Sequence, residues 1–222
     1  MKTVTYSLIF AFIALLNPLQ AQVENMKIQA LQDSLKQHPD DSSIMMQLGK
    51  MYHALGAQGE KDMVGNAEQM FQAVIEREPN NADAHCWYGS VLTLKGRDSM
   101  LPFNKMRHVK DGNKEMDLAV SLDSTNIAVR LTRANTSLAL PSLFNRIDYA
   151  IADFKYYVSA YEMAPQYFNE AQYGDVLVKL GHAYQKKGLT ELAKATWQKV
   201  IDVMPNSVFA TNALKLLKEM EG

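Results

Sequence analysis

The chain has 222 residues, of which 47% are hydrophobic and 21% are charged, and its formal net charge is -1. This composition provides enough apolar material for a folded core. A net charge so close to zero creates no long-range field that would draw nucleic acid or an anionic membrane to the chain. We therefore expect no nucleic-acid partner.

The N-terminal residues, 1–21, have the pattern of an export signal. Lys2 supplies a basic start, and the apolar run from Ser7 to Leu16 is too short to span a bilayer comfortably. Pro18 breaks this run, and Ala21 offers a small residue for cleavage. We predict cleavage after Ala21 and a periplasmic or secreted protein, with an uncleaved membrane anchor as the alternative. No later segment of the mature chain is apolar enough to span a membrane.

The cysteine content sets how an exported fold of this kind can be held together. Cys86 is the single cysteine of the chain, so no intrachain disulfide can form. We expect the fold to be stabilised by side-chain packing alone.

The mature chain, 22–222, is predicted to form one helical domain with a capping helix at each end. Ile28, Leu31 and Leu35 recur at helical spacing in the first capping helix, at about 23–38. The second capping helix is expected at about 207–220. Such helices cover the exposed core at the two ends of a repeat array.

Between the two capping helices, one spacing of small and large residues recurs. In its clearest copy it is carried by Leu177, Gly181, Tyr184, Gly188, Ala193, Trp197, Val200 and Pro205. The repeats are predicted at about 42–80, 82–125, 127–162 and 174–207.

Each kind of residue in this spacing has a physical reason. Small residues allow two helix axes to cross closely, and they are Gly49, Gly89, Ala134 and Gly181. Glycines that adopt the left-handed conformation can end a first helix, and we expect this of Gly56, Gly96 and Gly188. Prolines cannot continue a helix, and those expected to follow a second helix are Pro39, Pro79 and Pro205.

These residues resemble the tetratricopeptide repeat (TPR) family, whose helix–turn–helix unit has a period of about 34 residues. The resemblance implies an all-α fold: a right-handed α-solenoid of about four repeats with N- and C-terminal capping helices. The middle repeats depart from the family pattern. His85 and Arg130 stand where a large apolar residue is common, and Ser124 stands where proline is usual.

Extra residues at about 57–66 and 97–111, and a shorter set after Pro141, fall between the first and second helices of their repeats. We expect them to emerge in the turns along one edge of the array, where insertions often form a binding face. The larger insertion mixes cations with apolar side chains, and its predicted partner-binding residues are Arg97, Phe103, Lys105 and Arg107. The alternative is that Leu101, Phe103 and Val109 only pin the insertion onto the array.

The resemblance also implies a concave face formed by the first helices. The residues that would face it are Met46, Lys50, Cys86, Ser90, Leu131, Asn135, Val178 and His182. Of these, the predicted partner-binding residues are Met46, Lys50, Ser90, Asn135 and His182. The row lacks the regular lysine–asparagine pattern with which chaperone-binding members hold C-terminal carboxylates, so we favour a shallow, adaptable peptide groove.

The pair His85-Cys86 is the one sequence feature that invites a catalytic or metal-binding interpretation. Neighbours on a helix point in different directions and do not form a nucleophile–base pair. There is no second cysteine for a thiolate metal site, and the histidines lack the spacing of a helical metal pair. We predict no catalytic residue, no metal and no cofactor.

The sequence therefore predicts an exported, non-catalytic adaptor or scaffold. It would bind a protein or peptide through the concave groove, the inserted edge, or both. The first alternative is a ligand-binding or assembly component of an envelope transport system, in which the basic insertion contacts a carboxylate or another subunit. An enzyme is the last alternative.

Overall fold

The computed structural model describes residues 22–220, and every regular element in that range is helical. The predicted export signal at 1–21 lies outside the described residues, so its cleavage stays a prediction. Among the described residues, those up to Pro79 form one compact unit and those from Asn80 onward form a second.

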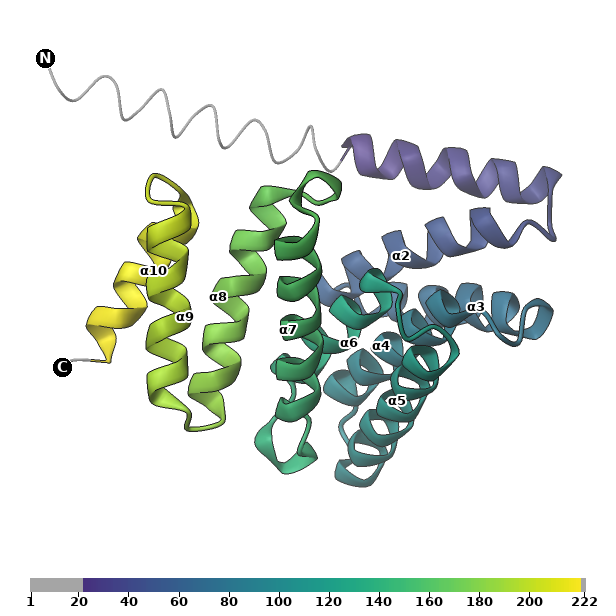
Figure 1. Ribbon diagram of the computed structural model, residues 1–222. Coiled ribbons are helices and arrows are strands. Elements are labelled where there is room, and N and C mark those ends of the chain that lie inside the picture. Colours follow the sequence, from purple (N-terminus) through teal and green to yellow (C-terminus); the bar gives the residue numbers. More distant parts are fainter. Residues whose placement is uncertain (1–21, 221–222) are drawn as a thin grey trace, which may run out of the picture. The chain divides into compact units, whose positions relative to one another are not determined.

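The first unit is built from three described helices. In chain order they are a helix at 22–37, α2 (Ser42–Gln58) and α3 (Lys61–Arg77) (Figure 1). Gly49 of α2 lies against the ring of Phe71 on α3, and a β-carbon at Gly49 would come within 2.7 Å of that ring. The helix at 22–37 is joined to α2 by a hydrogen bond of 2.7 Å from Gln32 Nε2 to the Tyr52 hydroxyl.

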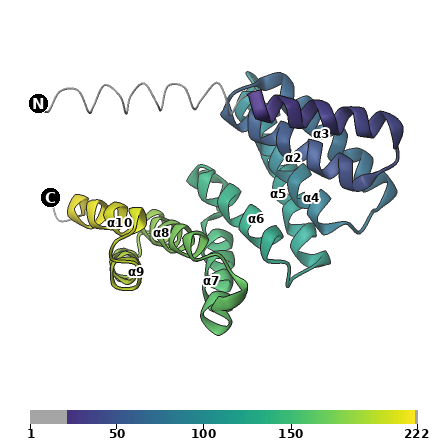
Figure 2. The same cartoon turned by 90° about the horizontal axis from the view of Figure 1, so that it is seen from above.

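The second unit consists, over its described residues, of helix pairs followed by one further helix. The pairs are α4 (Ala82–Asp98) with α5 (Pro102–Leu122), α6 (Ile127–Ala139) with α7 (Ile147–Met163), and α8 (Glu170–Lys186) with α9 (Thr190–Val203), and the last helix is α10 (Val208–Glu219). Short 3-10 turns lie at Ser142–Phe144 and Pro165–Tyr167. Figures 1 and 2 show α8 between α7 and α9.

The first helix of each described pair begins at a polar capping side chain. Asp41 accepts hydrogen bonds from the backbone of Ser43 and Ile44 at the start of α2. The side chains that cap α4, α6, α8 and α10 in the same way are Asn81, Asn126, Asn169 and Ser207. These side chains satisfy backbone N–H groups that a helix leaves unpaired at its N-terminus. The second helices α3, α5, α7 and α9 have no such side-chain cap.

The close helix crossings predicted at glycines are confirmed. A β-carbon at Gly89 of α4 would lie 2.5 Å from the carbonyl oxygen of Gly112 on α5, so here the two backbones themselves are in contact. Gly181 of α8 lies directly against the indole of Trp197 on α9, whose Nε1 donates a hydrogen bond of 3.1 Å to the Val178 carbonyl.

The predicted glycine helix ends are right at one position and wrong at two. Gly188 follows α8 with a φ of 81°, in the left-handed region. Gly56 and Gly96 instead lie inside α2 and α4, each packed against a valine of the paired helix. The left-handed cap of α2 is Gly59, with a φ of 115°. The physical reason is that the extra residues continue the helices beyond the expected glycines.

The two larger insertions are corrected in the same sense, because most of their residues are helical rather than exposed in a turn. Pro102 starts α5, a position at which its fixed φ is favourable. Residues 102–111 are therefore the first turns of α5, and only 99–101 connect it to α4. The extra residues after Pro141 do lie in the connection between α6 and α7, which contains the short 3-10 turn at Ser142–Phe144.

The helix ends beside prolines follow the prediction. The helix at 22–37, α3 and α9 end two residues before Pro39, Pro79 and Pro205 respectively. A further helix end lies at Met163, where α7 stops and Pro165 begins a short 3-10 turn.

Candidate partner-binding surfaces

The groove residues predicted in the first unit lie on α2. Met46 and Lys50 are one helical turn apart and both are half-buried. Their neighbours Met45 and Gly49 are buried. Within this unit the two predicted side chains therefore border the packed face of α2.

Most of the groove row in the second unit is buried between helices. Cys86 is 0% exposed and its Sγ donates to the Val129 carbonyl at 3.3 Å. Ser90 is 6% exposed and its hydroxyl lies 3.4 Å from that of Thr136. The row on α4 thus faces α6 rather than solvent, because these two helices pack against each other. Leu131 and Val178 are buried as well. We leave Ser90 out of the surface that a partner can reach.

Two predicted groove residues of the second unit remain accessible. Asn135 on α6 is exposed, and His182 on α8 is half-buried with its ring 5.3 Å from that of Trp197. Asp175 and Lys179 share the α8 face with His182 and form an ion pair of 2.7 Å. We name Asp175, Lys179 and His182 the α8 stripe. It offers an anion, a cation and an imidazole within two helical turns.

The connection between α4 and α5 presents a cluster of exposed apolar side chains, which we call the tip. Its apolar members, with their exposed fractions, are Met100 (95%), Leu101 (62%), Phe103 (76%) and Met106 (37%). Of the residues expected to pin this segment, Val109 alone is buried, against Gly96. Leu101 and Phe103 do not pin it and are available to a partner.

The charges around the tip are predominantly positive. Arg97 makes a two-point contact with Asp98, with Nε and a terminal nitrogen 2.7 and 2.9 Å from the carboxylate oxygens. This hydrogen-bonded pairing raises the pKa of Arg97. The exposed side chains of Lys105, Arg107 and Lys110 form no ion pair within the described part of the chain.

A buried ion-pair network in the second unit was not anticipated from the sequence. Asp153 of α7 is 0% exposed and accepts hydrogen bonds from Arg130 and Arg133 of α6 at 2.7–2.9 Å. Asp117 of α5 accepts from Arg133 at 3.1 Å and from Arg146 at 2.7 and 2.8 Å. The network therefore joins α5, α6 and the start of α7.

The guanidinium groups of this network are further held by aromatic faces. Arg130 lies 4.1 Å from the ring centroid of Tyr156, and Arg146 lies 3.7 Å from that of Tyr149. Burial disfavours the charge of Arg133, but the hydrogen bonds and charge of Asp153 outweigh it and raise its pKa. The one sequence signal of this network was Arg130 at a normally apolar repeat position.

The pair His85-Cys86 has no nucleophilic geometry. His85 Nδ1 lies 2.6 Å from Glu115 Oε2, so the imidazole is engaged by a carboxylate of α5. Burial raises the pKa of the Cys86 thiol to about 12, which keeps it protonated and unreactive. Within 22–220, no three His, Cys, Asp or Glu side chains are grouped so that they could hold a metal ion.

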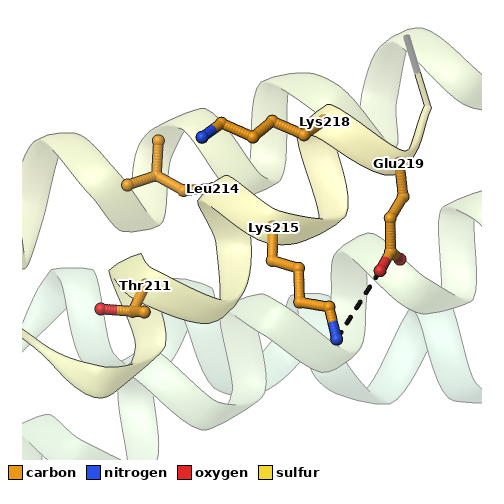
Figure 3. A pocket seen from close by; sticks show the side chains of 5 residues that line it. All are labelled: Thr211, Leu214, Lys215, Lys218 and Glu219. Atoms are coloured by element: carbon orange, nitrogen blue, oxygen red, sulfur yellow. Dashed lines mark ion pairs between the residues drawn. The ribbon is translucent and has the colours of Figure 1, made fainter. Parts of the chain in front are cut away.

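An open depression of about 470 Å³ lies on the outer face of α10 (Figure 3). It is lined by Thr211, Leu214, Lys215, Lys218 and Glu219. Lys215 is paired with Glu219 at 3.7 Å. All five side chains come from one helix, so a ligand here would not be enclosed by a second element.

No helix among the described residues has the length and apolarity needed to cross a membrane.

Comparison with known proteins identifies one repeat by sequence and the fold by structure. Residues 175–207 match the sequence pattern of the tetratricopeptide repeat. No curated protein matches the chain. The structure is similar to that of TTC0263, a thermophilic TPR protein of Thermus thermophilus, with a TM-score of 0.67, 14% identity, and coverage of 91% of this chain and 94% of that one.

Two further solved structures have the same fold. YrrB, described as "a TPR protein with an unusual peptide-binding site", has a TM-score of 0.53 and 20% identity, covering 92% of this chain and 89% of its own. MamA has a TM-score of 0.52 and 16% identity, covering 84% and 91%. The expected all-α fold of the tetratricopeptide repeat type is confirmed.

Proposed function

We propose that this chain is a non-catalytic adaptor that binds a protein or peptide. The repeat fold supports the proposal, since repeat arrays of this kind present extended binding surfaces. The likeness to YrrB supports it further, because that protein is described as having a peptide-binding site. Preordered helices lose little conformational entropy on binding, so a modest contact surface suffices.

The observation that carries the proposal is the α8 stripe. Lys179 and Asp175 provide a cation and an anion, with their side chains 35% and 44% exposed. His182 stands one turn further along and is braced by the indole of Trp197. A rigid row of hydrogen-bonding groups recognises the polar backbone and side chains of an extended peptide. Asn135 on α6 adds an exposed amide in the same unit.

The proposal places the adaptor outside the cytoplasm, in the periplasm or secreted. The support for this is the export-signal pattern of residues 1–21, with Lys2 before an apolar run and Ala21 at its end.

An affinity capture from a native envelope extract tests the proposed function. The mature chain, Gln22 to Gly222, serves as bait, and mass spectrometry identifies proteins and small molecules in the eluate. A protein partner should bind at least tenfold more weakly to the double variant Asn135→Ala, His182→Ala. The matched control replaces the exposed residues Gln198 and Lys155 by alanine. Equal binding by the parent chain, the double variant and the control variant would refute the role of this surface. A retained small-molecule carboxylate without any protein partner would favour the alternative function, a component of an envelope transport system.

A further inference from the structure

The tip is the most apolar exposed segment of the second unit. Met100 and Leu101 lie in the connection itself, while Phe103 belongs to the first turn of α5. All three lie within four consecutive residues at the junction of α4 and α5. Because 62–95% of each of these side chains is exposed, all three are available to enter an apolar phase.

Three cations of α5 lie at defined distances along the helix from the apolar residues of the tip. At a rise of about 1.5 Å per residue, Lys105, Arg107 and Lys110 lie about 3 to 11 Å along α5 from Phe103. Interfacial apolar groups enter a bilayer by about 5–10 Å, as far as the boundary between headgroups and acyl chains. Insertion of the apolar residues of the tip would therefore place the three cations at the level of the lipid phosphates. The nearest acidic side chain in the connection, Asp98, is already neutralised by Arg97.

The neighbouring connections of the second unit extend this surface. Figure 1 shows the α4–α5, α6–α7 and α8–α9 connections at the lower ends of their helix pairs. Leu143 is 61% exposed in the second of these connections, and Leu189 and Leu192 are 38% and 49% exposed at the third. The acidic residue at this edge of α7, Asp148, is paired with Lys187.

We propose that the tip docks on the surface of an anionic lipid bilayer. The apolar residues Met100, Leu101 and Phe103 enter the interface, and Lys105 and Arg107 contact lipid phosphates, with Lys110 behind them. The attraction is local, because the chain as a whole has a net charge of -1. The proposal goes beyond the adaptor function and does not depend on it: docking through the tip would leave the α8 stripe free for a partner.

A fluorescent label at the tip tests this proposal. In the complete chain, Asn104→Cys carries an environment-sensitive dye beside Phe103, and Ser121→Cys carries the same dye in the last turn of α5, about 25 Å away. The native Cys86 is buried and is not labelled. The probes are vesicles of phosphatidylcholine alone and vesicles in which about one-third is anionic phosphatidylglycerol. All samples carry residues 1–21, so any lipid binding by that segment is common to them.

The expected result is a rise in emission at position 104, and not at 121, with the anionic vesicles only. A basic residue near an anionic surface contributes roughly fivefold to binding, so the triple variant Lys105→Gln, Arg107→Gln, Lys110→Gln should lower the partition coefficient about a hundredfold. Unchanged emission at 104 with anionic vesicles would overturn the proposal, as would a triple variant that partitions like the parent. A label silent toward vesicles that responds to an acidic protein would overturn it too and assign the tip to a protein.

Discussion

Replacing Gly89 by alanine tests whether α4 and α5 are held at the distance set by their backbones. The new β-carbon would lie 2.5 Å from the Gly112 carbonyl oxygen and 3.0 Å from the Met116 backbone nitrogen, whereas ordinary contacts begin at 3.4 Å. Backbone atoms cannot rotate away as a side chain can, so the helices themselves must separate by roughly half an ångström or more.

The magnitude follows from two opposing effects. Overpacking of this kind costs about 3 kcal/mol at the upper end of its usual range. Removing a glycine from a helix interior returns about 1 kcal/mol. The free energy of unfolding should therefore fall by about 2 kcal/mol, which for a chain of this length lowers the melting temperature by about 4–8 °C.

Urea unfolding followed by far-ultraviolet circular dichroism measures this change. Both tryptophans, Trp87 and Trp197, lie in the second unit, so their fluorescence reports the unit that contains Gly89. The matched control is Gly65→Ala on α3 of the first unit, where an added β-carbon meets no atom within 4 Å, and circular dichroism alone follows its unfolding. It should raise stability by about 0.5–1 kcal/mol. If Gly89→Ala unfolds at the same urea concentration as the parent, the backbone-contact argument is refuted.

Three further predictions follow from buried and paired groups. Asp153→Asn leaves two arginines without their shared carboxylate and should lower the free energy of unfolding in urea by about 3–5 kcal/mol, whereas Asp33→Asn at an exposed pair should leave the midpoint unchanged. Cys86, with its pKa raised to about 12, should react with a thiol reagent at mildly alkaline pH only after unfolding, and rapid reaction of the native chain would contradict its burial. The hydrogen bond from Lys199 lowers the pKa of Glu162, so its carboxylate stabilises the fold above the ordinary carboxyl pKa, and this contribution disappears as pH falls through the lowered value. Glu162→Gln should flatten the acid side of the stability curve, and an unchanged slope would argue against this pairing.

The helix pairing could be predicted from sequence because its determinants are local. A glycine and a large side chain at fixed spacing specify a close crossing whatever surrounds them, as Gly49 with Phe71 and Gly181 with Trp197 show. The polar caps Asn81 and Asn126 are local signals of the same kind.

The helix lengths could not be predicted in this way. Gly96 looks like a helix end in the sequence, yet it lies inside α4, where Val109 of α5 packs directly against it. That contact depends on the paired helix and leaves no mark in the residues near Gly96. The extra residues after it therefore join a helix, and what was expected as a loop becomes the first turns of α5.

The candidate surface was predictable only in part for a related reason. The packing of α6 against α4 decides which face of α4 meets solvent, and it buries Ser90. Asn135 on α6 and His182 on α8 remain accessible. The sequence around a charged residue says even less about which residue it will pair with. Nothing in the sequence near Arg133 indicates that its carboxylates stand on α5 and α7.

The buried ion-pair network limits how freely the repeats of this protein can be exchanged. Its five charged side chains come from α5, α6 and the start of α7. The charges of the network therefore do not cancel within any single helix pair. A consensus repeat substituted for residues 127–162 would leave Asp117 without Arg133 and Arg146. The helix pair α8–α9 contributes no member of the network and is the natural place for repeat grafting or duplication. The repeats of this chain thus differ in how independently they can be replaced, and an engineered array should keep α5, α6 and α7 together.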